Sequence, residues 1–183
     1  MTLERIVIVG KPGAGKTTLG SQLATRLGLF SAELDAISWQ PNWVQLPDEE
    51  MRERVSELIR ENDKWVLDGN YKRLRDTIWA QADTLIWLDY SLWITLWRLF
   101  WRTMGRVFKR KELWNGNRES LGNHLKFGPD NLFAWTIEVH KSHRIDFPIF
   151  FEQPEYRHLK ILRFRSPRET ENWLQTIPSA REA

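Results

Sequence analysis

The chain has 183 residues, of which 42% are hydrophobic and none is cysteine. This length suits one α/β domain over 1–183. The absence of cysteine excludes disulfides, thiolate metal sites and thiol catalysis. It also suits the reducing cytoplasm, where we expect the protein. The net charge of +3 and isoelectric point of about 9.3 suit an enzyme of phosphorylated substrates as well as a nucleic-acid binder. We predict no secretory leader and no membrane span, because the most apolar stretch, 85–104, is interrupted by Asp89, Arg98 and Arg102.

The segment 4–27 contains the most informative motif. A β-branched run at 6–9 leads into GKPGAGKT at 10–17, which matches the phosphate-binding pattern G-x-x-x-x-G-K-[ST], and a helix over 16–27 follows. Glycines let successive N–H groups turn inward and form a cradle for phosphate oxygens. We expect Lys16 to reach the β- and γ-phosphates and Thr17 to offer its hydroxyl to Mg²⁺. The residues predicted to hold ATP in this loop are Gly10, Pro12, Gly13, Ala14, Gly15, Lys16 and Thr17.

A weak strand over 29–34 is predicted next, directly before Asp35. The carboxyl ends of parallel strands face the ligand, so Asp35 is a candidate to hold or activate an acceptor hydroxyl, and a turn or helix-capping role is the alternative. The loop 38–47 contains Trp39 and Trp43 and is long enough to cover an acceptor pocket. An amphipathic helix is predicted over 48–61.

Two further strands each end in an aspartate. The strand 64–67 leads into DGNY at 68–71, and the strand 84–89 ends in Asp89. Asp68 and Asp89 both fit the magnesium role that such enzymes need, and their spacing does not separate them. Between them, a helix over 72–81 presents three basic residues to an acceptor or a phosphate. The substrate-binding residues predicted in this stretch are Asp68, Gly69, Asn70, Tyr71, Lys72 and Arg73.

A long helix is predicted from 91 to about 110. Arg98, Arg102 and Arg106 recur at four-residue spacing and so share a face, beside a ridge of tryptophans at 93, 97 and 101. Guanidinium groups in such a row clamp phosphates and stabilise charge during phosphoryl transfer. The alternative is a solvated basic face next to a core stripe, and the functional role is favoured for Arg98 and Arg102.

The region from about 105 to 145 has too many residues for a simple connector and predicts an active-site lid. A helix at about 131–144 contains His140 and His143, which we interpret as surface or packing residues because no metal spacing accompanies them. A last strand over 159–164 and a helix over 167–176 complete the chain. The loop 165–168, with Arg168, is placed to flank a nucleotide base.

The order of these segments resembles the adenylate-kinase-like P-loop nucleoside and nucleotide kinases, over about residues 4–175. More narrowly, LDAISWQPNW, DGNY, WLDYSLW and LWNGNRES resemble the bacterial family often labelled adenylate-kinase-related or DNA-topology-modulation-like proteins. The resemblance implies an α/β P-loop NTPase fold in three layers, with a five-stranded parallel sheet, helices on both faces and a lid insertion at about 105–145.

The resemblance also implies roles for single residues. Thr18 joins the triphosphate-binding residues, and Asp68 takes the magnesium-water role in preference to Asp89. Lys72 or Arg73 lies near the position of an acceptor-phosphate arginine, and Arg98 and Arg102 become the base-stacking and phosphate-clamping arginines. Asn70-Tyr71 replaces the Phe-Pro that follows D-G in true adenylate kinases, which leaves the acceptor open.

Two functions follow as hypotheses. The first is an ATP- and Mg²⁺-dependent phosphotransferase that acts on a small nucleoside, nucleotide or other hydroxyl compound, with Lys16, Asp35, Arg98 and Arg102 as catalytic residues. The second is an ATP-responsive nucleic-acid binder, which the basic isoelectric point and the mixed tryptophan and arginine helix favour. An NTPase switch ranks last, since no N-K-x-D guanine-reading element is present. A monomer and a homodimer both remain open.

Overall fold

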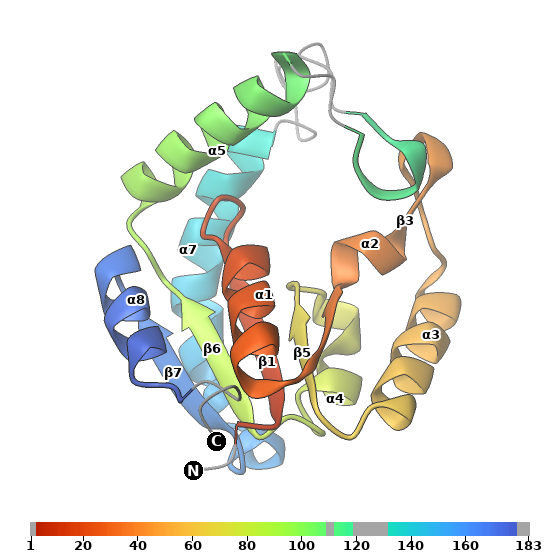
Figure 1. The fold of residues 1–183 in the computed structure, drawn as a ribbon, viewed down its shortest axis with the longest axis vertical. Coiled ribbons are helices and arrows are strands. Elements are labelled where there is room, and N and C mark those ends of the chain that lie inside the picture. Colours follow the sequence, from red (N-terminus) through yellow and green to blue (C-terminus); the bar gives the residue numbers. More distant parts are fainter. Residues whose placement is uncertain (1–2, 109–111, 119–131, 179–183) are drawn as a thin grey trace.

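The computed structural model describes residues 3–108, 112–118 and 132–178. Its centre is a parallel sheet of five strands in the order β2-β5-β1-β6-β7 (Figure 1). The strands lie at the five predicted places, and the predicted α/β fold with a five-stranded parallel sheet is therefore confirmed. They are β1 (Arg5–Gly10), β2 (Phe30–Glu33), β5 (Trp65–Asp68), β6 (Thr84–Leu88) and β7 (Lys160–Phe164).

Helices cover both faces of this sheet, because successive side chains of a strand point to opposite faces and both sets are apolar. On one face, Val7 and Trp87 join a buried cluster with α3, α4 and α7. On the other face, Ile8 and Ile86 join a second cluster with α1 and α8. The helices are α1 (Lys16–Leu27), α3 (Asp48–Glu61), α4 (Arg75–Ile78), α5 (Leu92–Phe108), α7 (Leu132–Phe151) and α8 (Pro167–Gln175).

The segment after β2 is more ordered than the sequence predicts. The strand ends at Glu33, and the short helix α2 (Leu34–Ser38) carries Asp35 in its first turn. Leu34 is buried against Gly69, where an added Cβ would lie 2.7 Å from the Leu34 Cβ. The loop then forms a small antiparallel pair, β3 (Trp39–Gln40) and β4 (Val44–Gln45). These contacts fix the chain beside the end of β5.

Two predicted helices have different lengths in the structure. The one over 72–81 is reduced to a 3-10 turn (Lys72–Leu74) followed by the four residues of α4. The one at about 131–144 is extended to Phe151, since Phe147 is fully buried and packs edge-on against Trp79 and Trp87, at centroid distances of 6.0 and 5.2 Å. Tertiary packing therefore decides where each of these two helices ends.

The predicted lid at about 105–145 is described in part. Its described residues are the end of α5, the segment 112–118 with a 3-10 turn (Trp114–Gly116), and the first two-thirds of α7. The remaining residues, 109–111 and 119–131, lie outside the described structure. None of the helices in the described ranges is long and apolar enough to cross a membrane.

Candidate active site

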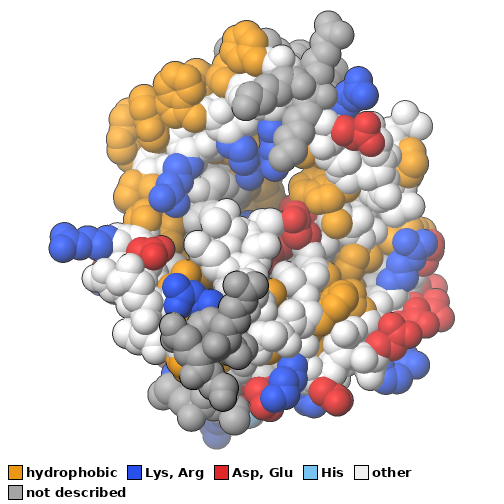
Figure 2. All heavy atoms as spheres, viewed as in Figure 1, with side chains coloured by type: hydrophobic (Ala, Val, Ile, Leu, Met, Phe, Trp, Pro, Cys, Tyr) orange, Lys and Arg blue, Asp and Glu red, His pale blue; other side chains and the backbone are white. Residues whose placement is uncertain are grey.

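A cavity of about 1650 Å³ opens at the edge of the sheet where β1 and β5 end. It is lined by the glycine-rich loop, by the segments that follow β2 and β5, and by parts of α5, α7, α8 and the segment 112–114. Basic and acidic side chains gather around this hollow (Figure 2). The carboxyl-terminal edge of a parallel sheet is where ligands bind in open α/β proteins. The cavity is therefore the candidate active site.

The glycine-rich loop has the backbone that its sequence predicts. Gly13 and Gly15 have φ angles of 78° and 92°, in the left-handed region that favours glycine. A Cβ at Gly13 would lie only 2.4 Å from the backbone oxygen of Thr95 in α5, so the loop packs directly against that helix. Helix α1 begins after Gly15, and its unpaired N–H groups border the cavity. This arrangement is suited to binding an anion.

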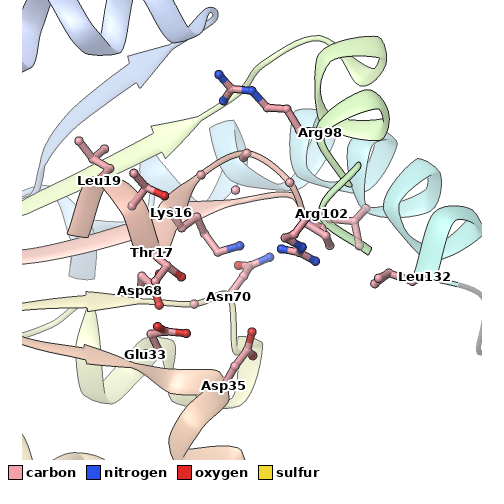
Figure 3. A pocket seen from close by; sticks show the side chains of 18 of the residues that line it. Lys16, Thr17, Leu19, Glu33, Asp35, Asp68, Asn70, Arg98, Arg102 and Leu132 are labelled. Carbon is pink, nitrogen blue, oxygen red and sulfur yellow. The ribbon is translucent and has the colours of Figure 1, made fainter. Parts of the chain in front are cut away.

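Lys16 lies at the centre of the cavity. Its Nζ donates to the loop carbonyl of Lys11 at 3.5 Å, and the side chain points toward Asn70 and Arg102 (Figure 3). Burial lowers the pKa of Lys16, and the carboxylates of Asp35 and Asp68 oppose that effect. The amine thus sits between the arginines of α5 and the carboxylates that follow β2 and β5.

Asp68 ends β5 beside Thr17. It is 6% exposed, and burial raises its pKa from 3.8 to about 6, although the interactions with the Thr17 hydroxyl and with Lys16 act in the opposite direction. Its Oδ2 is buried and has no hydrogen-bond partner within the described ranges. Glu33 and Asp35 also face this space, and their negative charges add to the rise (Figure 3). Three carboxylates therefore surround the end of β5.

Three arginines of α5 line the opposite side of the cavity. They are Arg98, Arg102 and Arg106, so the row predicted from the sequence does face one space, and Arg106, which was the least favoured, belongs to it. The Arg98 guanidinium lies 5.8 Å from the Tyr90 ring centroid. The tryptophans of the same helix point away from the site, since Trp93, Trp97 and Trp101 are 75%, 54% and 56% exposed. The core-stripe alternative for these tryptophans is therefore wrong.

The segment that follows Asp68 is tied to three other elements. The Tyr71 hydroxyl donates to Asp35 Oδ1 at 2.7 Å, and Asn70 pairs with Nε2 of the buried His143 in α7. Arg73 forms an ion pair with Asp48 at the start of α3. Lys72 is exposed at the cavity rim. These contacts hold the DGNY sequence at the cavity wall.

His143 behaves as the packing residue that the sequence predicts. Its ring stacks on Phe147 at a centroid distance of 4.3 Å, and burial lowers its pKa to about 3. The imidazole is therefore neutral at physiological pH. Its contact with Asn70 was not foreseen, because 73 residues separate the two.

Asp89 lies in a different environment from Asp68. It is 2% exposed, its Oδ1 accepts from Arg144 at 3.0 Å, and its Oδ2 accepts from Arg163 at 2.6 Å. Lys11 of the glycine-rich loop lies 3.8 Å away and donates to His140 Nδ1 at 2.7 Å. Asp89 is not among the residues that line the cavity. Its carboxylate instead joins β6, β7, α7 and the loop.

Most of the predicted site residues do meet in this one cavity. Arg168 is not among its lining residues, although its neighbours Pro167 and Thr170 are, because Arg168 lies on the exposed side of the first turn of α8. The predicted residues that line the cavity are Gly10, Pro12, Gly13, Ala14, Gly15, Lys16, Thr17, Thr18, Asp35, Trp39, Asp68, Gly69, Asn70, Tyr71, Lys72, Arg73, Arg98 and Arg102.

Sequence reasoning missed two residues that line the cavity beside Asp35. Glu33 was hidden inside a predicted strand. Trp114 belongs to the segment 112–118, and its Nε1 donates to Glu33 Oε2 at 3.2 Å. The family resemblance includes this segment as LWNGNRES but implies no role for the Trp114 indole.

The loop, its lysine and the five-stranded parallel sheet define this protein as one with the α/β fold of P-loop kinases. No protein-family model and no curated protein matches the chain. The narrower resemblance to the DNA-topology-modulation-like family therefore stays a prediction.

The likeness to solved structures covers nearly the whole chain. A gluconokinase from Sinorhizobium meliloti 1021 superposes with a TM-score of 0.54 at 17% identity, over 96% of this chain and 94% of that one. A shikimate kinase from Acinetobacter baumannii, in complex with shikimate, gives 0.52 at 18% identity, over 96% and 91%. A sugar kinase from Janibacter sp. HTCC2649 gives 0.53 at 19%, over 95% and 94%. These likenesses establish a shared fold.

Proposed function

We propose that this protein is an ATP- and Mg²⁺-dependent phosphotransferase that moves the γ-phosphate of ATP to a hydroxyl of a small acceptor. The observation that carries the proposal is the division of one cavity into a basic side and an acidic side, with Lys16 between them. Neighbours in fold are a gluconokinase, a shikimate kinase and a sugar kinase, all named for small acceptors.

The residues present fit a magnesium ion. Thr17 is exposed and lines the cavity with its side chain close to Asp68, and the buried Asp68 Oδ2 lacks a hydrogen-bond partner in the described ranges. Hard cations prefer oxygen ligands, so Thr17 and Asp68 would hold the ion directly or through water. When bound, magnesium would offset charge on the β- and γ-phosphates.

The chain's own groups supply binding, orientation and charge. The loop N–H groups and Lys16 would hold the phosphates, and Arg98 and Arg102 would stabilise the charge that develops on the transferred group. The acceptor oxygen bonds to the γ-phosphorus, the bond from that phosphorus to the β,γ-bridging oxygen breaks, and ADP leaves. The hydroxyl proton passes to a carboxylate, for which Asp35 is the candidate.

The test is label transfer from γ-labelled ATP with Mg²⁺ to a panel of nucleosides, nucleoside monophosphates, sugars and amino alcohols. Lys16→Ala should abolish transfer and leave the thermal unfolding transition intact. Lys64→Ala, which removes an exposed lysine paired with Glu4, is the matched control and should retain transfer. Full turnover by Lys16→Ala would refute the assignment.

A second candidate is ATP-responsive nucleic-acid binding, and the observation that favours it is the exposed tryptophan ridge of α5. Trp93 and Trp97 stack at a centroid distance of 6.3 Å, and aromatic platforms of this kind bind single strands. The arginines of α5 line the cavity on the other side of the helix, which favours the kinase. DNA affinity that falls steeply with salt and is lost in Trp97→Ser would reverse this order.

A further inference from the structure

The acceptor side of the cavity has an unusual combination of side chains. Three tryptophans, Trp39, Trp43 and Trp114, line it together with the carboxylates of Glu33 and Asp35. Trp39 and Trp43 meet edge to face at a centroid distance of 5.5 Å. These three indoles are called the tryptophan wall below.

Aromatic hydroxyl and N–H groups fix both carboxylates. The Trp114 Nε1 donates to Glu33 at 3.2 Å, and the Tyr71 hydroxyl donates to Asp35 at 2.7 Å. Each carboxylate keeps further acceptor capacity, since an ionised carboxylate has about four lone-pair sites. The two acids therefore face the cavity in set orientations and can still bind a ligand.

The tryptophan wall is assembled from two segments that are distant in the sequence. The buried Asn117 accepts from the Trp43 N–H at 2.9 Å and donates to the Gln40 and Trp114 carbonyls at 2.8 and 2.9 Å. Asn115 donates to the Trp39 carbonyl at 2.6 Å. The segment 112–118 is thus hydrogen-bonded to β3 and to the turn that follows it.

Backbone strain accompanies this assembly. Trp43 has a φ of 58°, a left-handed conformation that a bulky side chain rarely adopts. Strained residues persist only where surrounding contacts fix them, and they are frequent at binding sites. The contacts of Asn117 hold Trp43 in this conformation at the cavity.

Lys16 attracts Glu33 and Asp35 electrostatically, but neither carboxylate has an ion-pair partner within the described ranges, whereas Arg73 is paired with Asp48. Carboxylates among aromatic rings attract a ligand cation by direct charge and by cation–π interaction. The same carboxylates would repel an acceptor that carries a carboxylate or phosphate at this place.

We propose that the acceptor is an amino alcohol, with a cationic nitrogen held between the tryptophan wall and Glu33 and a hydroxyl turned toward Lys16. This proposal rests on the proposed function and adds the chemical class of the acceptor. The hydroxyl oxygen bonds to the γ-phosphorus, ADP leaves, and the hydroxyl proton passes to Asp35 and then to solvent. The product is a phosphate monoester that keeps its ammonium group. A linear amino alcohol and an amino sugar both present this chemistry.

Matched pairs of acceptors test the proposal, with γ-labelled ATP and Mg²⁺. Choline is compared with its neutral isostere 3,3-dimethylbutan-1-ol, and glucosamine is compared with glucose and N-acetylglucosamine, with gluconate as the anionic member. We expect kcat/KM for one cationic member to exceed that of its neutral partner at least tenfold. The pair that shows the preference identifies the linear or the cyclic source.

Variants separate charge from shape. Glu33→Gln should reduce the preference to within about threefold, chiefly through KM, because it keeps the side-chain volume and the partner of Trp114 but removes the charge. Glu61→Gln, which removes an exposed carboxylate at the end of α3, is the matched control and should keep the preference. The affinity of each variant for the same ammonium compounds, measured by calorimetry, gives a readout independent of turnover.

The outcomes distinguish the two proposals. Transfer to neutral or anionic members at equal or higher efficiency overturns the amino-alcohol proposal and leaves the phosphotransferase in place. Binding of a cation that Glu33→Gln abolishes supports the cation site, but without transfer to any member it overturns the amino alcohols as acceptors; only absence of transfer across the wider panel above would also refute the phosphotransferase. If no cationic member exceeds its neutral partner in transfer or in binding, the amino-alcohol proposal is wrong.

Discussion

Replacing Asp68 by asparagine is expected to stabilise the protein at neutral pH and to remove phosphoryl transfer. Burial raises the pKa of Asp68 from 3.8 to about 6, so the folded state binds this proton more tightly than the unfolded state. Above pH 6 the folded protein must hold a buried charge, which lowers its stability. As the pH falls from 6 to 3.8 this cost disappears.

The magnitude follows from the difference in pKa. A difference of about 2 corresponds to about 3 kcal/mol at pH values above both pKa values. The asparagine side chain carries no charge, so the variant should be about 3 kcal/mol more stable than the parent at pH 7.5 and about equal to it near pH 4. A site that is less stable in its working form is typical where binding demands a buried charge.

Urea unfolding of Asp68→Asn and of the parent, at pH 7.5 and pH 4, measures this difference. Asp63→Asn, an exposed aspartate in the turn before β5, is the control and should change stability by less than about 0.5 kcal/mol at both pH values. A parent protein as stable as Asp68→Asn at pH 7.5 would refute the reasoning, since Asp68 would then carry no burial cost. Mg²⁺ binding to the free parent protein should weaken as the pH drops through about 6, because the metal-free Asp68 takes up a proton there.

Two further substitutions test the packing of the glycine-rich loop. Gly13→Ala should abolish ATP binding and lower the melting temperature, because φ is 78° and the new Cβ would lie 2.4 Å from the Thr95 oxygen. The control is Gly105→Ala in α5, where nothing lies within 4 Å of the new Cβ; it should raise the melting temperature because alanine favours the helix. Unchanged ATP affinity in Gly13→Ala would contradict the predicted clash with Thr95. Asp89→Ala should lower the free energy of unfolding, measured in urea, by about 3–5 kcal/mol, because Lys11, Arg144 and Arg163 all lose the carboxylate with which they pair. A loss below about 1 kcal/mol would show that the cluster adds little to stability.

Local sequence was sufficient wherever neighbouring residues decide the structure. The glycine-rich loop, the position of Lys16 and the helix α1 could be predicted because eight consecutive residues specify the backbone of the loop. The arginine row could be predicted because helical spacing alone places Arg98, Arg102 and Arg106 on one face. Sequence spacing did not show that this face, rather than the tryptophans, borders the cavity.

Contacts between distant residues could not be predicted in the same way. Asp68 and Asp89 follow similar apolar strands, yet one lines the cavity and the other is held by Arg144 and Arg163. This difference depends on which chains pack over each strand end, and those chains are distant in the sequence. The helix α7 extends past 144 for the same reason, because Phe147 packs against tryptophans of other elements.

The sequence by itself determined the fold class, the glycine-rich loop and the basic face of α5, because each depends on residue spacing within one segment. Only the tertiary structure decided the aromatic and acidic side of the cavity. Glu33, Trp43 and Trp114 meet there through hydrogen bonds between segments that are about 70 residues apart or more. Such contacts form only after the sheet has brought the strand ends together, so local sequence patterns do not predict them.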